Sequence, residues 1–120
     1  MNADEKPASL DGPTTAAALP ARHRIGSFEL LSVAQRSSAG LVYHAWDHAL
    51  VRPVAIKEYL PATLALRDAN GDVHPRDPAC AAAFECGRGG FVDEARMLAR
   101  CDHPSLVRVL DLVETCGTAY

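Results

Sequence analysis

The sequence predicts an α+β fold in which an antiparallel sheet of about five strands packs against one long helix. Three apolar stretches come before any helical pattern, and short polar links join them as in an antiparallel meander. These stretches are 28–34, 41–47 and 53–59. A helical pattern follows at 91–100, and two more strand-like stretches, at 106–110 and from 118 onward, complete the expected set.

Length and composition indicate one ordinary globular domain of 120 residues with a net charge of −3. Residues 1–24 mix Ala, Pro, Thr and charge without a regular period, so we expect a disordered tail before a domain at 25–120. The twelve Lys and Arg are scattered, which argues against nucleic-acid binding. No apolar stretch reaches the roughly 20 residues of a membrane span, and the start lacks the order of a signal peptide, so we expect a cytoplasmic protein.

Metal binding is not expected. The four cysteines are widely and unevenly spaced without a Cys-x-x-Cys pair, which argues against both a zinc site and a disulfide framework. The run at 68–72 resembles the start of a calcium loop, but Val73 and Ala79 stand where that motif needs glycine and glutamate.

The third apolar stretch carries a single lysine, Lys57. Side chains alternate faces along a strand, so Ala55 and Lys57 share one face while Val54 and Ile56 share the other. Burying an unpaired ammonium costs on the order of several kcal/mol, so we expect Lys57 to meet a carboxylate, a phosphate or both. The alternative is a lysine at the end of a strand whose head group reaches water.

The helix offers one candidate partner for this lysine. Phe91, Ala95 and Leu98 fall at helical spacing on one face, and Glu94 lies on the same face. No basic residue stands three or four positions from Glu94, so its partner must come from another element, and Lys57 is the simplest candidate. The alternative is a Glu94 that turns outward to water.

Residues 58–84, between the third strand and the helix, are expected to form an insert with a small hairpin at 64–75. Asn70 and Gly71 suit a turn with two positive φ values. Three glycines just before the helical pattern predict a loosely held helix N-terminus, since each costs about 0.5–1 kcal/mol relative to alanine. They are Gly87, Gly89 and Gly90.

This order of residues resembles the start of a protein kinase domain, especially that of bacterial serine/threonine kinases, over about 28–120. The strongest piece is Val54-Ala55-Ile56-Lys57, which matches the Val-Ala-Ile-Lys of the family's third strand. The resemblance implies a kinase-like small lobe in which Lys57 holds the α- and β-phosphates of ATP and Glu94 is its helix partner. The insert also looks like one found in a subgroup of bacterial kinases.

The hairpin between the first two strands departs from the family pattern. Where the family has Gly-x-Gly-x-x-Gly, residues 35–40 keep only Gly40, the third glycine, while Gln35 and Ser37 replace the others and restrict close approach to phosphates. The resemblance implies an apolar ceiling over adenine, and a plain structural interpretation explains the same residues as small core positions of a sheet. They are Ala34, Val42 and Ala55.

The family's hinge, its His-Arg-Asp loop and its Asp-Phe-Gly metal ligand would follow the last residue, so no catalytic residue is predicted and Mg²⁺ is expected only through segments missing here. The resemblance implies that the complete protein transfers the ATP γ-phosphate to protein Ser/Thr, with this chain inactive on its own. The alternative is a degenerate, non-catalytic remnant that docks a partner protein.

Overall fold

The computed structural model describes residues 17–120, and the rest of the predicted tail, 1–16, lies outside the described residues. Residues 17–24, which the sequence analysis assigned to the tail, instead pack against the sheet. Leu19 is only 5% exposed, and the backbone amide of Leu30 donates to the carbonyl of His23. The packed part of the chain therefore begins before residue 25.

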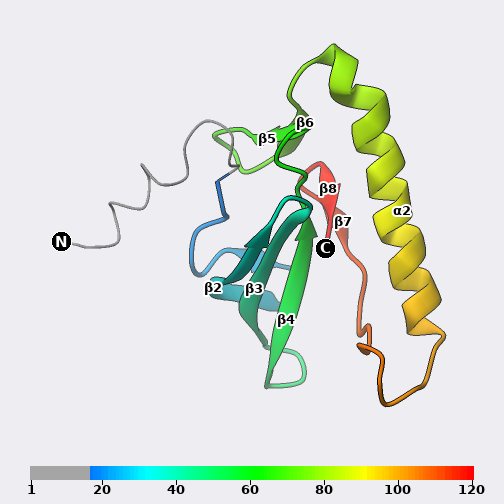
Figure 1. The fold of residues 1–120 in the computed structure, drawn as a ribbon. Helices are drawn as coiled ribbons and strands as arrows, with labels where there is room; N and C mark the ends of the chain where they lie inside the picture. Colours follow the sequence, from blue (N-terminus) through cyan, green and yellow to red (C-terminus); the bar gives the residue numbers. More distant parts are fainter. Residues whose placement is uncertain (1–16) are drawn as a thin grey trace.

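The main sheet is antiparallel, with four strands in chain order (Figure 1). The strands at 40–47 and 52–59 match the predicted stretches to within one residue and pair without a break, while two bulges interrupt the first hairpin. The strands are β1 (Arg24–Ile25), β2 (Phe28–Ser37), β3 (Gly40–Asp47) and β4 (Arg52–Tyr59).

The two faces of this sheet have different surroundings. One face carries the buried side chains of Leu30, Tyr43 and Ile56, which form the core with residues of the N-terminal segment and the insert. On β4 the exposure alternates, so that Ala55 and Lys57 are exposed while Ile56 is buried, as the sequence predicted. The open face is therefore the one that carries Lys57.

The insert forms the predicted hairpin, from β5 (Ala65–Arg67) to β6 (Val73–Pro75). Its connection spans five residues, and of Asn70 and Gly71 only Gly71 has a positive φ, of 90°, so the predicted turn type is wrong. The carboxylate of Asp68 organises the connection, because its Oδ1 accepts from the amides of Asn70 and Asp72 at 2.8 and 3.0 Å.

The helix is longer than predicted. A short 3₁₀ turn, η1 (Pro78–Cys80), leads into α2 (Ala81–Ala99), which runs through all three glycines. Proline at the start of η1 and the Asp77 carboxylate, which accepts from the Cys80 amide, fix this entry. The expectation of a helix that begins near Phe91 with a loose N-terminus is therefore wrong.

The predicted strand at 106–110 is absent, since residues 100–113 form no helix or strand. Strand pairing depends on neighbours that are distant in sequence, which an apolar stretch alone does not specify. A short hairpin follows, with two residues in each strand, β7 (Glu114–Thr115) and β8 (Thr118–Ala119). It turns at Cys116 and Gly117, which have φ of 55° and 75°.

The architecture is the predicted α+β arrangement of an antiparallel sheet and one long helix, with four strands in the main sheet and two small hairpins beside it. Figure 1 shows the β7–β8 hairpin beside the end of β4, on the side toward α2. Within residues 17–120, no helix is both long and apolar enough to cross a membrane.

Candidate functional site

Five of the predicted site residues line one hollow under the β2–β3 hairpin. Gln35 pairs with Val42 across one ladder and Val42 pairs with Lys57 across the next, so the three side chains stand on one rung of the sheet. The hollow has a volume of about 180 Å³. Its lining consists of Gln35, Ser37, Gly40, Leu41, Val42 and Lys57.

Lys57 points from the exposed face of β4 toward α2. Its Nζ lies 5.9 Å from the centre of the Phe91 ring, at the outer limit of a cation–π contact. Among the described residues, no carboxylate lies within ion-pair distance of this ammonium. Lys57 is exposed. Of the two interpretations that the sequence allowed, a lysine whose head group reaches water therefore matches this structure better than a buried lysine.

Glu94 does not reach Lys57. It is exposed on α2, one turn beyond Phe91, and the described part of the chain holds no ion pair between the two. The predicted pair is therefore not formed in this structure, although Phe91, on the same helix face, does meet Lys57. The outward-turned Glu94 is the alternative that this structure contains.

The three residues predicted to form an apolar ceiling over adenine differ in burial, and one of them lines the hollow. Val42 is half-buried and lines the hollow. Ala34 falls in the second bulge of β2 and Ala55 lies two residues before Lys57 on β4, and both are exposed on the sheet. The interpretation as small core residues is therefore wrong for these two alanines, which leaves their surface open.

The turn above the hollow is held by hydrogen bonds. Ser37 Oγ accepts from the Ala39 amide at 3.2 Å and donates to the Gly40 carbonyl at 3.4 Å. The Ala39 carbonyl accepts from the Leu60 amide at 3.0 Å, which ties the turn to the chain just after β4. One of the amides that a phosphate could use is therefore already occupied by a side chain.

Gly40 is the position where the turn requires glycine. Its φ is 156°, and a Cβ placed on it would overlap the carbonyl oxygen of Glu58 on the neighbouring strand. The glycine that the sequence retains is therefore explained by close approach of two backbones.

The sequence pattern did not predict a buried ionic network that begins at the residue after Lys57. Glu58 is fully buried, and its Oε1 accepts from the Tyr43 hydroxyl and from Arg67 Nη2, both at 2.7 Å. Arg67 also donates to the carbonyls of Ala17 and Gly71. Burial, followed by the Glu58 carboxylate, raises the pKa of Tyr43. This network binds the N-terminal segment and the insert to β4.

The signal for this network was present in the alternation of β4. Glu58 is two residues after Ile56, so it falls on the core-facing side of the strand, where a carboxylate needs a partner. The partner, Arg67, lies in the insert hairpin, and its position depends on a fold that local sequence does not reveal.

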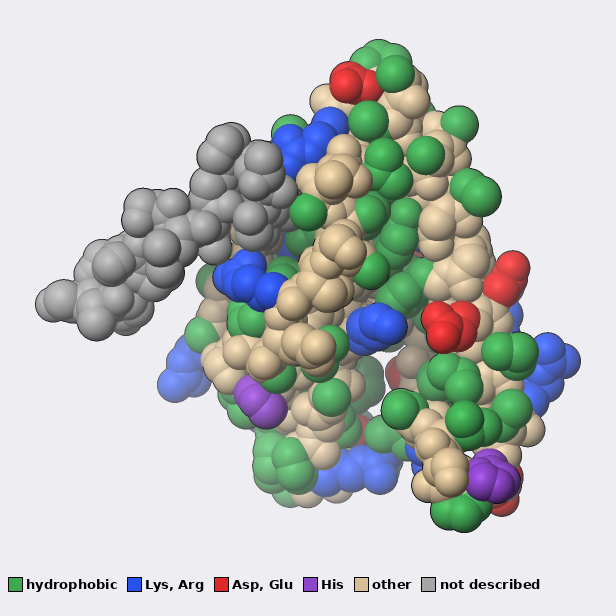
Figure 2. Space-filling model, in the orientation of Figure 1, with side chains coloured by type: hydrophobic (Ala, Val, Ile, Leu, Met, Phe, Trp, Pro, Cys, Tyr) green, Lys and Arg blue, Asp and Glu red, His purple; other side chains and the backbone are tan. Residues whose placement is uncertain are grey.

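Basic side chains are dispersed over the face shown in Figure 2 rather than gathered in a patch. In residues 17–120 no cluster of three or more His, Cys, Asp or Glu could hold a metal ion.

No protein-family model matches the chain. The chain is 34% identical, in an alignment of 90 residues that covers 72% of this chain, to the DNA damage-responsive serine/threonine-protein kinase RqkA of Deinococcus radiodurans. It also superposes on a solved structure, PpkA-294 in its apo form, with a TM-score of 0.82 and 40% identity over 85% of this chain. The chain spans 10% of RqkA and 36% of the PpkA-294 chain.

Proposed function

We infer the function from one premise, which is that this chain is the N-terminal lobe of a bacterial-type serine/threonine protein kinase domain. We propose that the lobe binds ATP in the hollow under the β2–β3 hairpin and that Lys57 holds the phosphates. In the complete protein this lobe would serve the transfer of the γ-phosphate to Ser or Thr of a protein substrate, in the cytoplasm.

The observation that carries the proposal is the rung of Gln35, Val42 and Lys57 beneath a turn closed by Gly40. It combines an apolar surface, a polar side chain and an ammonium in one hollow. Because no carboxylate among residues 17–120 neutralises Lys57, its charge is available to an anionic ligand.

The hydrogen bonds of the turn support a binding mode in which Lys57 binds the phosphates and the β2–β3 loop contributes little to phosphate binding. Glycine-rich loops bind phosphate through backbone amides, whereas here Ser37 occupies the Ala39 amide. We therefore expect weaker ATP binding than in a lobe with three loop glycines. The catalytic base and the Mg²⁺ ligands of the family belong to motifs that these 120 residues do not contain, so the lobe alone is not expected to transfer phosphate.

The test uses the chain's two lysines, Lys6 and Lys57. An acyl-phosphate derivative of ATP transfers its acyl group to a lysine amine close to the bound phosphates. We expect such a probe to modify Lys57 in preference to Lys6, and millimolar Mg-ATP to suppress the labelling of Lys57. Peptide mass spectrometry measures both sites in one sample, so Lys6 serves as the internal control.

Two variants complete this experiment. Lys57→Ala should abolish the thermal shift that Mg-ATP produces, while Arg108→Ala, which removes one positive charge from an exposed position, should leave the shift unchanged. Equal labelling of the two lysines without protection by Mg-ATP would contradict the proposal.

A second candidate function is that of a non-catalytic module that docks a partner protein. The observation that favours it is the exposure of Leu106, Val107 and Leu110, at 46%, 76% and 52%, in the segment that forms no strand. Substitution of these three residues by Ser should abolish partner binding without affecting the Lys57 labelling, if docking is the function.

A further inference from the structure

Helix α2 is attached to the rest of the lobe through its first two-thirds. The Tyr59 hydroxyl, at the end of β4, donates to the Phe84 carbonyl at 2.9 Å, and the ring of Tyr59 packs against those of Phe84 and Phe91 at 5.3 and 5.8 Å. Arg88 lies 3.7 Å from Glu114 of β7. Phe84 and Val92 are the buried residues of this helix.

Tyr59 fits into a notch in α2 that a missing side chain creates. A Cβ on Gly87 would overlap the Tyr59 hydroxyl and come within 3.1 Å of Cζ. Gly89, two residues later on the same helix, has nothing within 4 Å of its would-be Cβ. Tyr59 is also held from behind, because Thr118 Oγ1 donates to its carbonyl. The glycine at 87 is thus matched to one aromatic side chain.

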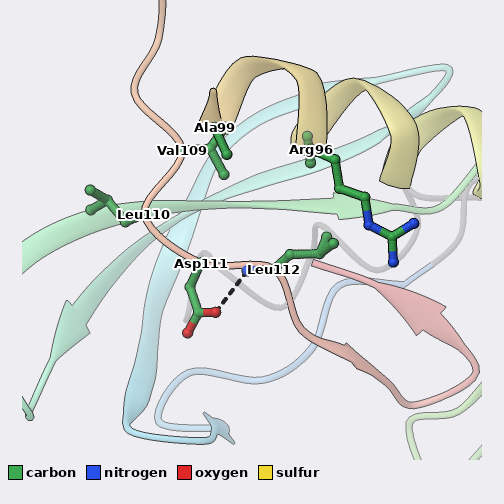
Figure 3. A pocket seen from close by; sticks show the side chains of 7 residues that line it. Arg96, Ala99, Val109, Leu110, Asp111 and Leu112 are labelled. Atoms are coloured by element: carbon green, nitrogen blue, oxygen red, sulfur yellow. Dashed lines mark hydrogen bonds between the residues drawn. The ribbon is translucent and has the colours of Figure 1, made fainter. Parts of the chain in front are cut away.

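Beyond Val92 the helix has no buried residue, and Met97 is 55% exposed. A hollow of about 120 Å³ lies between this part of α2 and residues 109–112. Figure 3 shows Arg96 and Ala99 projecting from the helix into this region, while Asp111 bonds back to the Leu112 amide. The part of α2 that carries Glu94 is therefore packed much less tightly than the part that holds Tyr59.

We propose that Tyr59, seated in the notch at Gly87, is the positioning residue that fixes α2 on β4 and serves as the point about which Glu94 approaches or leaves Lys57. The proposal rests on the proposed role of Lys57 and deepens it. Lys57 and Tyr59 are two residues apart on one strand, so the point that holds the helix and the lysine that Glu94 must reach belong to one rigid element.

The helix geometry relates a tilt at the notch to the displacement of Glu94. Glu94 is seven residues after Gly87, so at 1.5 Å per residue it lies about 10 Å along the helix axis from the notch. A tilt of about 20° at the notch would then move the backbone at Glu94 by roughly 4 Å. Phe91, closer to the notch, moves less and keeps its contact with Lys57 over a wider range of positions.

The experiment compares amide hydrogen exchange in residues 93–99 of the full 120-residue chain for three single variants. Tyr59→Phe removes the hydroxyl and keeps the ring, and should accelerate exchange there roughly five-fold, as expected for one lost buried hydrogen bond. Gly87→Ala should accelerate it at least as much. Gly89→Ala is the matched control, since it adds the same methyl group to the same helix in open space and should slow exchange or leave it unchanged.

The double variant Tyr59→Phe/Gly87→Ala separates a specific fit from general damage. Removal of the hydroxyl takes away the atom that the new Cβ overlaps, so the double variant should exchange more slowly than Gly87→Ala alone. Equal rates of amide exchange in Gly87→Ala and Gly89→Ala would overturn the proposal that Tyr59 is held in a notch at Gly87. If Gly87→Ala fails to fold, Tyr59→Phe still decides, because unchanged exchange in that variant also overturns the proposal.

A readout of positioning comes from the labelling of Lys57. In the parent chain, Glu94→Gln should reduce the protection of Lys57 by Mg-ATP, and in the Tyr59→Phe background that dependence on Glu94 should be lost. Persistence of the full Glu94 effect in Tyr59→Phe would overturn the positioning role. Absence of any Mg-ATP protection in the parent chain would refute the proposed function alone, because the exchange results test the anchor without nucleotide.

Discussion

The buried contact between Arg67 and Glu58 makes the sharpest prediction about stability. Replacement of Arg67 by Met keeps most of the side-chain volume and removes the charge that lies 2.7 Å from Glu58 Oε1. The Arg67 and Glu58 side chains are 5% and 0% exposed, so water cannot replace the lost partner without opening the core.

The expected loss is large relative to the stability of the lobe. Removal of one partner from a buried ion pair costs about 3–5 kcal/mol, because the remaining charge is left uncompensated. For the 104 residues from 17 to 120, a typical total of about 0.05–0.15 kcal/mol per residue gives roughly 5–15 kcal/mol. Arg67→Met should therefore remove about a fifth or more of the free energy of unfolding.

Urea denaturation followed by circular dichroism measures this loss, with Arg88→Met as the matched control. Arg88 makes two longer contacts with carboxylates, at 3.6 and 3.7 Å, in a more exposed setting, so its loss should cost no more than about 1 kcal/mol. The double variant Glu58→Gln/Arg67→Met removes both charges and keeps a carbonyl oxygen for the Tyr43 hydroxyl. It should be more stable than Arg67→Met alone.

Either of two results would refute this reasoning. One is a loss for Arg67→Met as small as that for Arg88→Met, which would mean that the Glu58 charge is solvated in some other way. The other is a double variant that is as unstable as the sum of its single variants, which would mean that the two side chains do not act as a pair.

Three further predictions concern the strand ends, the tyrosines and the insert. Gly40→Ala should cost about 2 kcal/mol or more, because the new Cβ overlaps the Glu58 carbonyl, whereas Gly26→Ala, with a φ of 59° and open space around it, should cost less in the same denaturation assay. Burial raises the pKa of all three tyrosines above 10.0. The tyrosines of the unfolded chain therefore ionise first, so their contribution to stability should be constant up to about pH 10 and fall above it. Tyrosine absorbance that titrates at pH 10 in the folded chain would contradict this. The hydrogen bond from His74 lowers the pKa of Asp68 below 3.8. The contribution of the Asp68 carboxylate to stability should therefore be complete above pH 3.8 and be lost as the pH falls through the lower pKa of the folded chain. Asp68→Asn should show a shallower acid transition than the parent chain.

Local pattern was sufficient for the three predicted strands of the main sheet and insufficient for the helix and for the stretch at 106–110, which forms no strand. The alternation around Lys57 gave the correct faces of β4, because exposure in a strand repeats every two residues whatever lies beyond it. The start of α2 was placed ten residues too late, because glycines that weaken an isolated helix are here embedded in a packed one. Gly87 in particular is compensated by the Tyr59 ring, a contact between residues 28 positions apart that no local pattern contains.

The missing pair between Lys57 and Glu94 has the same origin. Chemical complementarity and helical spacing pointed to Lys57 and to the helix face that carries Glu94, and the Phe91 contact places that part of α2 next to the lysine although Glu94 itself is turned outward. Whether the charges meet depends on the tilt of α2, which is set by packing against β4 and β8 rather than by the residues of the helix.

Three consecutive residues at the end of β4 join the site to everything that surrounds it. Lys57 faces the hollow, Glu58 faces the buried network with Arg67, and Tyr59 faces α2. Since a strand moves as one unit, a change that shifts Glu58 in the core must also shift the lysine and the anchor of the helix. The insert, which supplies Arg67, is thus built into the support of Lys57, so loss of the ion pair should weaken nucleotide protection of that lysine even though Arg67 does not line the hollow.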